Sequence, residues 1–110
     1  MIFHITTSSE WESAQAVGAY EASSLVSEGF IHLSELSQVV ATANLRFAGV
    51  PGLVLLCVDE ERIEAELKRE PSRGGELFPH VYGPLNLDAV VDVLPLAERD
   101  GSFVLPQQLA

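Results

Sequence analysis

The apolar run at residues 53–59 constrains the fold of this chain more than any other stretch. A run of this length without polar alternation is typical of a strand that is buried on both faces of a sheet. Gly49, Pro51 and Gly52 precede it and end the segment before it. The chain has 110 residues, which is the size of one domain and leaves no room for a second core. We therefore expect a single domain, residues 1–110, organised around this central strand.

The spacing of apolar residues predicts the other elements. A short helix is expected at residues 10–17, where Gly18 provides the stop, and an amphipathic helix is expected at 35–47, with Ser34 or Ser37 as its N-cap. Further strands are predicted at residues 2–6, 20–22, 29–34, 63–68, 89–94 and 103–105, with a polar connection at 23–28, a turn at 60–62, a loop at 71–75 and a hairpin turn at 99–102.

Two of the predicted strands carry a histidine followed two residues later by a hydroxyl. His4 and Thr6 form the first pair, and His32 and Ser34 form the second. Side chains two residues apart on a strand point to the same face, so each pair shares one face while the apolar neighbours pack behind it. We expect the two strands to lie side by side and both pairs to belong to one site.

A second group of chemically active side chains lies between residues 76 and 84. It contains a carboxylate, an imidazole and a phenol, from Glu76, His80 and Tyr82. Pro79 and Pro84 exclude a helix here, because proline lacks the backbone N–H and restricts the residue before it. These side chains are therefore candidates for a role at the same site.

Metal binding is the alternative suggested by the three histidines. His4, His32 and His80 all lie in segments predicted to be strands or a fixed loop, and three protein ligands are enough for a catalytic zinc ion. No two of them lie one helical turn apart, so their spacing does not support a metal site. We expect no metal, and a histidine-based metal-dependent hydrolase stays open as the second alternative.

The charge balance excludes polyanionic partners. With 16 acidic and 6 basic residues, the formal net charge is -10. Nucleic-acid affinity is built chiefly from lysine and arginine side chains that neutralise phosphates, so we expect neither a nucleic-acid nor a membrane partner. The arginines are few and adjoin none of the motifs above: Arg46, Arg62, Arg69, Arg73 and Arg99.

The cysteine content and hydropathy pattern bear on the compartment. Cys57 is the only cysteine, so no intrachain disulfide can form, and a free thiol in an apolar run fits a reducing compartment. No basic segment precedes an apolar stretch at the N-terminus, and no apolar run approaches the roughly 20 residues that cross a bilayer. We expect a soluble, cytoplasmic protein.

The motifs together resemble a known family. The segments at 3–6, 18–20 and 28–34, with Trp11 between them, and above all the string at 76–85 are similar to the family called domain of unknown function 952. The resemblance covers essentially the whole chain. It implies an α+β fold of the ADP-ribosyltransferase type, with two small, mostly antiparallel sheets forming a cleft and two or three helices. The order of the two histidine strands is similar to the tRNA 2'-phosphotransferase branch of that fold.

This resemblance implies roles for the candidate residues in binding NAD or a related small nucleotide. His4 and Thr6 would hold the ribose at the nicotinamide end, and His32 with Ser34 would form the second-strand pair. Tyr20 or Tyr82 would stack on nicotinamide. Glu76 would act as the catalytic carboxylate, and His4, His32 and His80 are the other candidate catalytic residues.

The same resemblance leaves a non-enzymatic alternative open. Ile5 stands where the phosphotransferases have glycine, a residue that permits close backbone approach to a ligand. A non-catalytic module that binds a small ligand or a protein would keep the fold and its cleft without that glycine. The residues leave the enzyme and the non-catalytic module open as alternatives and indicate no oligomeric state.

Overall fold

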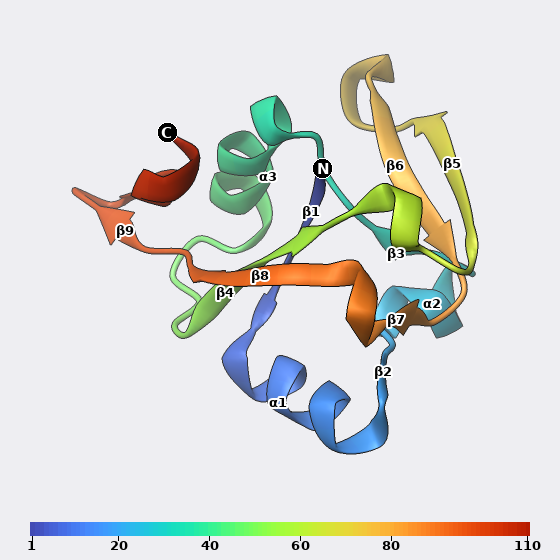
Figure 1. Cartoon of the computed structure of the whole chain (residues 1–110). Coiled ribbons are helices and arrows are strands. Elements are labelled where there is room, and N and C mark those ends of the chain that lie inside the picture. The colour runs from blue at the N-terminus through green and yellow to red at the C-terminus, as the bar shows by residue number, and fades with distance from the viewer.

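The computed structural model describes residues 1–110, and its central sheet contains the strand expected from the apolar run. In this antiparallel sheet, β4 (Leu53–Val58) lies between β1 (Ile2–Thr7) and β8 (Val90–Pro95). Figure 1 shows β4 and β8 crossing the middle of the molecule with β1 beside them. The prediction of a central strand is thus confirmed.

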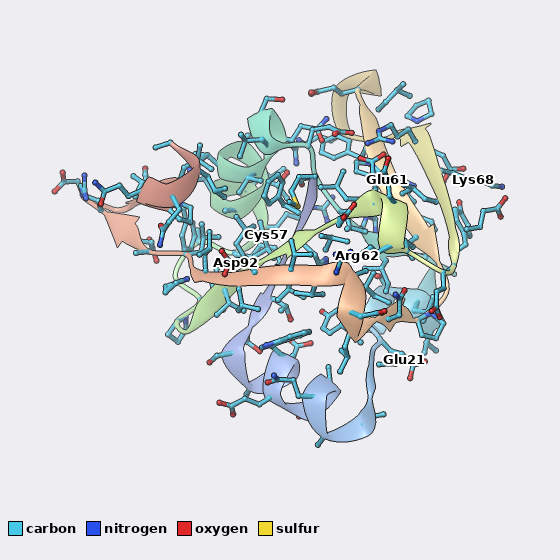
Figure 2. All side chains as sticks on the ribbon, in the orientation of Figure 1. Glu21, Cys57, Glu61, Arg62, Lys68 and Asp92 are labelled. Carbon is cyan, nitrogen blue, oxygen red and sulfur yellow. The ribbon has the colours of Figure 1, made fainter.

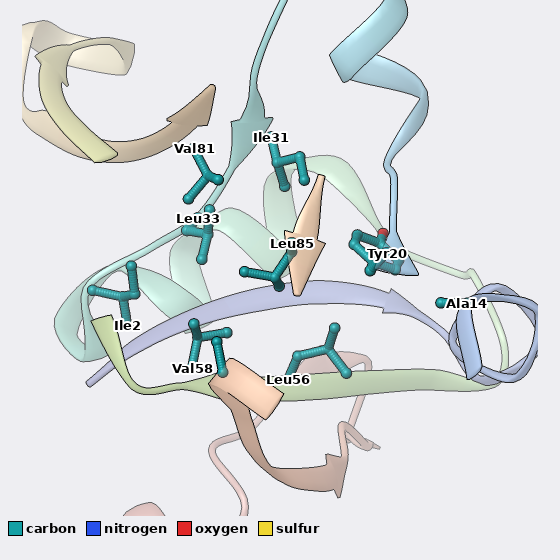
Figure 3. Packing of buried hydrophobic residues seen from close by; sticks show 10 residues of the cluster. Ile2, Ala14, Tyr20, Ile31, Leu33, Leu56, Val58, Val81 and Leu85 are labelled. Atoms are coloured by element: carbon teal, nitrogen blue, oxygen red, sulfur yellow. The ribbon is translucent and has the colours of Figure 1, made fainter. Parts of the chain in front are cut away.

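Burial on both faces of β4 divides the core into two clusters. Leu56 and Val58 face one cluster, which also contains Tyr20 and is shown in Figure 3. Leu55 and Cys57 face the other cluster, together with Phe3 and with Val39 and Ala43 of the helix α3 (Val39–Arg46). Alternate side chains of one strand therefore pack in opposite directions, which is why the sequence of this strand lacks polar alternation.

A second antiparallel sheet contains the other histidines. Its order is β3 (Ile31–His32), β6 (Leu77–Tyr82) and β5 (Glu66–Pro71). Phe3 of β1 and Ser34 exchange two backbone hydrogen bonds of 2.9 and 2.7 Å, so the first strand lies directly beside the segment that follows β3. This confirms the expectation that the two histidine strands are neighbours.

Three helices cover the sheets. Helix α1 (Ser8–Val17) is capped by Thr7, whose hydroxyl accepts from the Glu10 N–H, and ends at Gly18 with a φ of 101°. Helix α3 (Val39–Arg46) follows a 3-10 turn at Leu36–Gln38. Both helices begin within a few residues of the expected positions. The N-cap of the second helix differs from the expected one, because Glu35 caps the turn before α3 in place of Ser34 or Ser37.

Helix α2 (Ser23–Ser27) was not expected, because the sequence predicted a polar connection at 23–28. It is a single short helix of five residues whose only apolar residues are Leu25 and the exposed Val26. A helix of this length is too short to show the repeat that identifies longer ones. Its formation depends on the packing of Leu25 against the core cluster of Figure 3.

Several predicted strands differ in their bounds, and two of these differences have a clear structural cause. The strand expected at 63–68 is β5 at Glu66–Pro71. The segment before it does not pair as a strand, because its backbone is hydrogen-bonded to the Asn86 side chain, which donates to the Arg62 carbonyl and accepts from the Glu64 N–H. The strand expected at 29–34 pairs as β3 only at Ile31–His32, because Ser34 leaves β6 and pairs with β1.

Two small strand pairs complete the architecture. The first joins β2 (Ala19–Tyr20) to β7 (Leu85–Asn86), and the second joins β9 (Glu98–Arg99) to β10 (Ser102–Phe103) across the predicted hairpin turn. The structure is therefore α+β, with several small antiparallel sheets and three helices. None of its helices has the length and apolar character needed to cross a membrane.

The single thiol is part of the core. Cys57 is buried on β4 opposite Asp92 of β8, and the two side chains are labelled on their neighbouring strands in Figure 2. Burial raises the pKa of the Cys57 thiol to about 11, so it stays protonated and unreactive at neutral pH.

Candidate functional site

A pocket of about 280 Å³ lies beside the edge of β1 that does not face β4. Its walls come from β1, from β3 and the residues after it, from α2 and α3, and from the turn before β6. Five side chains that the sequence singled out line this pocket: His4, Thr6, Tyr20, His32 and Ser34. The two histidine and hydroxyl pairs therefore open onto one shared cavity.

A chain of hydrogen bonds fixes the inner end of the pocket. His4 Nδ1 lies 2.6 Å from the His32 carbonyl oxygen, and His4 Nε2 lies 2.7 Å from the Tyr20 hydroxyl, which is 3.0 Å from Thr6 Oγ1. A carbonyl oxygen only accepts, so Nδ1 carries the proton and donates it. In a neutral ring Nε2 then accepts from Tyr20, and Tyr20 in turn accepts from Thr6.

Burial keeps this network neutral. Desolvation lowers the pKa of His4 to about 4, so its imidazole is uncharged at neutral pH. Burial likewise raises the pKa of Tyr20 to about 12. Since both ring nitrogens of His4 already have partners, a ligand would contact the network through the Thr6 hydroxyl or by displacing Tyr20. The Tyr20 ring itself is 2 % exposed and packs in the core, so only its hydroxyl is presented to the pocket.

The edge of β1 adds backbone groups to the pocket. Phe3 uses its N–H and C=O to pair with Ser34, away from β4. Because these groups alternate in direction along an antiparallel strand, the N–H and C=O of Ile5 also point away from β4. Ile5 lines the pocket, which therefore has a strand edge with one free donor and one free acceptor.

Two arginines in the pocket wall were missed by the sequence reasoning. The expectation that no arginine adjoins the site is wrong, because Arg46 of α3 and Arg73 of the 3-10 turn before β6 both line the pocket. Arg73 lies 5.1 Å over the Phe78 ring and donates to Thr42 Oγ1 at 3.3 Å. No local motif indicated this, because the residues that meet here are about thirty positions apart in the sequence.

Two carboxylates also line the pocket, and each has a partner. Glu10 accepts from the Thr7 hydroxyl at 3.1 Å. Glu28 accepts from His32 Nε2 at 2.9 Å, and this hydrogen bond holds the pKa of Glu28 below its usual value. The pocket therefore combines neutral hydroxyls and an imidazole with charges of both signs at its rim.

The remaining predicted residues lie elsewhere. His80 and Tyr82 are on β6, outside the pocket lining, and both contact Glu70 of β5: His80 Nδ1 at 2.8 Å and the Tyr82 hydroxyl at 2.5 Å. The Phe30 ring stacks on His80 at 4.1 Å, and His80 Nε2 is buried without a hydrogen-bond partner. His32 links the pocket to this group on β6, because it lines the pocket and the centre of its ring lies 5.3 Å from the centre of the His80 ring.

Glu76 does not face the pocket either. Its carboxylate is exposed and accepts a hydrogen bond of 3.0 Å from Gln38 Nε2. No three side chains of the histidine, cysteine or acidic types gather in a way that could hold a metal ion. The metal-dependent alternative therefore has no candidate ligand set in this structure.

Glu70→Gln is expected to lower the melting temperature. A neutral amide would replace the carboxylate that accepts from both Tyr82 and His80, and the hydrogen bond to the buried imidazole would lose its ionic character. The matched control is Glu64→Gln, since the Glu64 side chain is exposed and makes no such bonds. Equal melting temperatures for the two variants in thermal denaturation would contradict this role for Glu70.

The fold and the pocket together define a small α+β protein with a cavity lined by histidine and hydroxyl side chains. Residues 5–93 match the model of the family described as protein of unknown function (DUF952), and the chain belongs to this family. The resemblance seen in the sequence motifs is thereby confirmed at the level of the family. No curated protein matches the chain.

Solved structures show the same fold over almost the whole chain. The crystal structure of protein CC0527 from Caulobacter crescentus is 40 % identical, and the alignment covers 98 % of this chain and 96 % of that one with a TM-score of 0.89. The solution NMR structure of CC0527 is 39 % identical over 93 % of this chain and 89 % of that one, with a TM-score of 0.80.

Proposed function

We propose that the protein binds NAD or a related small nucleotide in this pocket, on a fold of the ADP-ribosyltransferase type. The observation that carries the proposal is the convergence of Thr6 and Ser34 on one cavity beside the free strand edge at Ile5. Hydroxyls of this kind suit the hydroxyls of a ribose, and a backbone donor next to an acceptor suits a planar amide.

The size and lining of the cavity support a ligand of this class. At about 280 Å³ the pocket is near the lower end of the range for small-molecule sites, so it would enclose one half of a dinucleotide. Phe47 and Phe78 provide apolar walls. In a bound complex these rings would take the stacking role that the resemblance assigned to Tyr20 or Tyr82.

Enzymatic turnover of NAD would require a carboxylate near the glycosidic bond between nicotinamide and ribose. In the transferase version, a carboxylate stabilises the oxocarbenium-like transition state as nicotinamide leaves. Glu76 lies outside the pocket, whereas Glu28 is inside it and is held by His32. We assign this role to Glu28 in the enzymatic version of the proposal.

A second candidate, binding without turnover, is favoured by one observation. Ile5 stands at the strand edge where the related transferases have glycine, and its branched side chain packs in the core cluster with Leu55 and Cys57. A residue with a side chain permits less close backbone approach to a ligand than glycine does. Incubation with labelled NAD separates the two candidates. Nicotinamide release that is lost in Glu28→Gln supports the enzyme, and binding with no release supports the module.

Adding about 1 mM NAD is expected to raise the melting temperature by several degrees. If this concentration is about ten times the Kd, binding adds about 1.4 kcal/mol to the free energy of unfolding. Ser34→Ala is expected to reduce the shift, because Ser34 lines the pocket, whereas Ser37→Ala serves as the matched control on an exposed turn. No shift in the wild-type protein, or equal shifts in both variants, would count against the proposal.

A further inference from the structure

Half of the basic side chains of this acidic protein are paired with carboxylates. Of the 6 basic residues, Arg62 pairs with Asp59, Lys68 pairs with Glu66, and Arg69 binds both Glu35 and Glu60. The other three make no ion pair: Arg46, Arg73 and Arg99. A chain with 16 acidic residues offers many partners, so an arginine that stays unpaired keeps its donors available for another anion.

Two of these three unpaired arginines lie in the same pocket wall. Arg46 and Arg73 line the cavity, whereas Arg99 lies on the distant hairpin of β9 and β10. Arg46 follows Thr42 by four residues on α3, so the two side chains are neighbours on one face of that helix. Arg73 donates to Thr42, so Arg73 contacts the helix that carries Arg46, and both arginines line the same pocket.

Arg73 is held in place before any ligand arrives. Its guanidinium stacks over the buried Phe78 ring and uses one donor on Thr42, which leaves most of its five N–H groups free. A planar donor group fixed in this way loses little conformational freedom on binding. Ser72, which also lines the pocket, adds a hydroxyl beside it.

We infer that Arg46 and Arg73, with Thr42 and Ser72, form a subsite for a phosphate or pyrophosphate group. This inference deepens the proposed function and rests on the same pocket. Guanidinium groups bind phosphate oxygens through paired, charge-assisted hydrogen bonds, and hydroxyls donate to the remaining oxygens. The ligand is then a phosphorylated small molecule rather than a neutral nucleoside.

The charges around the subsite restrict the size of the anion. Glu28 lies near Arg46 but is already bonded to His32, and Glu10 is bonded to Thr7. At physiological salt, charges beyond about 8 Å are largely screened, so the net charge of -10 does not cancel two adjacent cations. A long polyanion would extend beyond the two arginines and be repelled by the acidic surface, whereas a compact anion would contact the arginines alone. The charges therefore favour a compact anion.

Inorganic pyrophosphate is the direct probe of this subsite. Titration followed by NMR is expected to shift the backbone amide signals of Thr42 and Ser72 and to saturate. The double variant Arg46→Gln with Arg73→Gln is expected to weaken binding at least about tenfold. Arg99→Gln is the matched control, because it removes an unpaired arginine outside the pocket. All three side chains are at least partly exposed, so the variants are expected to fold, and their melting temperatures check this.

Each outcome separates the subsite from the proposed function. If pyrophosphate does not bind the wild-type protein, or if Arg99→Gln weakens binding as much as the double variant, the subsite is wrong. If NAD binds the double variant as tightly as the wild type, the subsite is wrong and the nucleotide proposal stands. If pyrophosphate binds through Arg46 and Arg73 but NAD does not bind, the subsite stands and NAD is the wrong ligand.

Discussion

Acidification from about pH 7.5 to about pH 5 is expected to lower the free energy of unfolding by about 2 kcal/mol through His4 alone. Burial lowers the pKa of His4 in the folded protein to about 4, whereas an unfolded histidine titrates near its ordinary value of 6.5. Between these values only the unfolded chain takes up the proton. The stabilising contribution is therefore complete above the unfolded pKa and falls as the pH drops toward the folded one.

Urea denaturation at the two pH values tests this expectation. His4→Gln removes the buried imidazole, so the difference between the two free energies is expected to shrink by about 2 kcal/mol, whatever the variant costs at neutral pH. Tyr20→Phe is the control, because it removes a hydroxyl from the network and leaves the imidazole buried. If His4→Gln loses as much stability on acidification as the wild-type protein, His4 is not the neutral, buried group described above.

Leu56→Ala and Leu55→Ala are each expected to cost about 3 kcal/mol of unfolding free energy. Both side chains are completely buried, and they belong to the two clusters on opposite faces of β4. Removing either one leaves a cavity in addition to the lost burial. The matched control is Leu45→Ala on α3, because Leu45 is 61 % exposed and its truncation is expected to change stability by less than about 0.5 kcal/mol.

Equilibrium denaturation of the three leucine variants distinguishes a central strand from an edge strand. In a strand with one solvent-exposed face, one of the two substitutions on β4 would lower the free energy of unfolding strongly and the other would leave it almost unchanged. If either Leu55→Ala or Leu56→Ala costs no more than Leu45→Ala, the packing of β4 on both faces is wrong. His4 lies opposite Leu56 in the register, so the Leu56 cluster also supports the strand segment that carries the pocket network.

The pocket exists because only part of the edge of β1 that faces away from β4 is paired with another segment. Phe3 pairs with Ser34 and closes that part of the β1 edge, whereas Ile5 lies two residues further along and has no strand partner on that side. The Tyr20 hydroxyl is hydrogen-bonded to the side chains of both His4 and Thr6 and fixes their positions. The pocket therefore lies along the part of the β1 edge that has no strand partner.

Strand periodicity predicted that each histidine shares a face with its hydroxyl, and all four side chains line the pocket. His4 with Thr6 and His32 with Ser34 share a face because side chains alternate with a period of two, which holds in any sheet. The apolar run of β4 predicted the central strand for a similarly local reason. The family was also recognisable from short motifs, and the model match over residues 5–93 agrees with it.

The sequence could not predict which distant groups meet. Arg73 reaches Thr42 from 31 residues away, and His80 bonds Glu70 of the neighbouring strand rather than Glu76 of its own segment. Glu76 lies outside the pocket and accepts a hydrogen bond from Gln38. Contacts of this kind depend on strand pairing and on the placement of α3, neither of which is encoded by local spacing.

The sequence by itself therefore determined the strand that anchors the core, the face on which each histidine and hydroxyl lies, and the family. Only the tertiary structure decided that Arg46 and Arg73 join the pocket and that His80 and Tyr82 do not. The physical reason is that periodicity fixes the direction of a side chain from its own element, whereas a binding site is made by the elements that the fold packs around it.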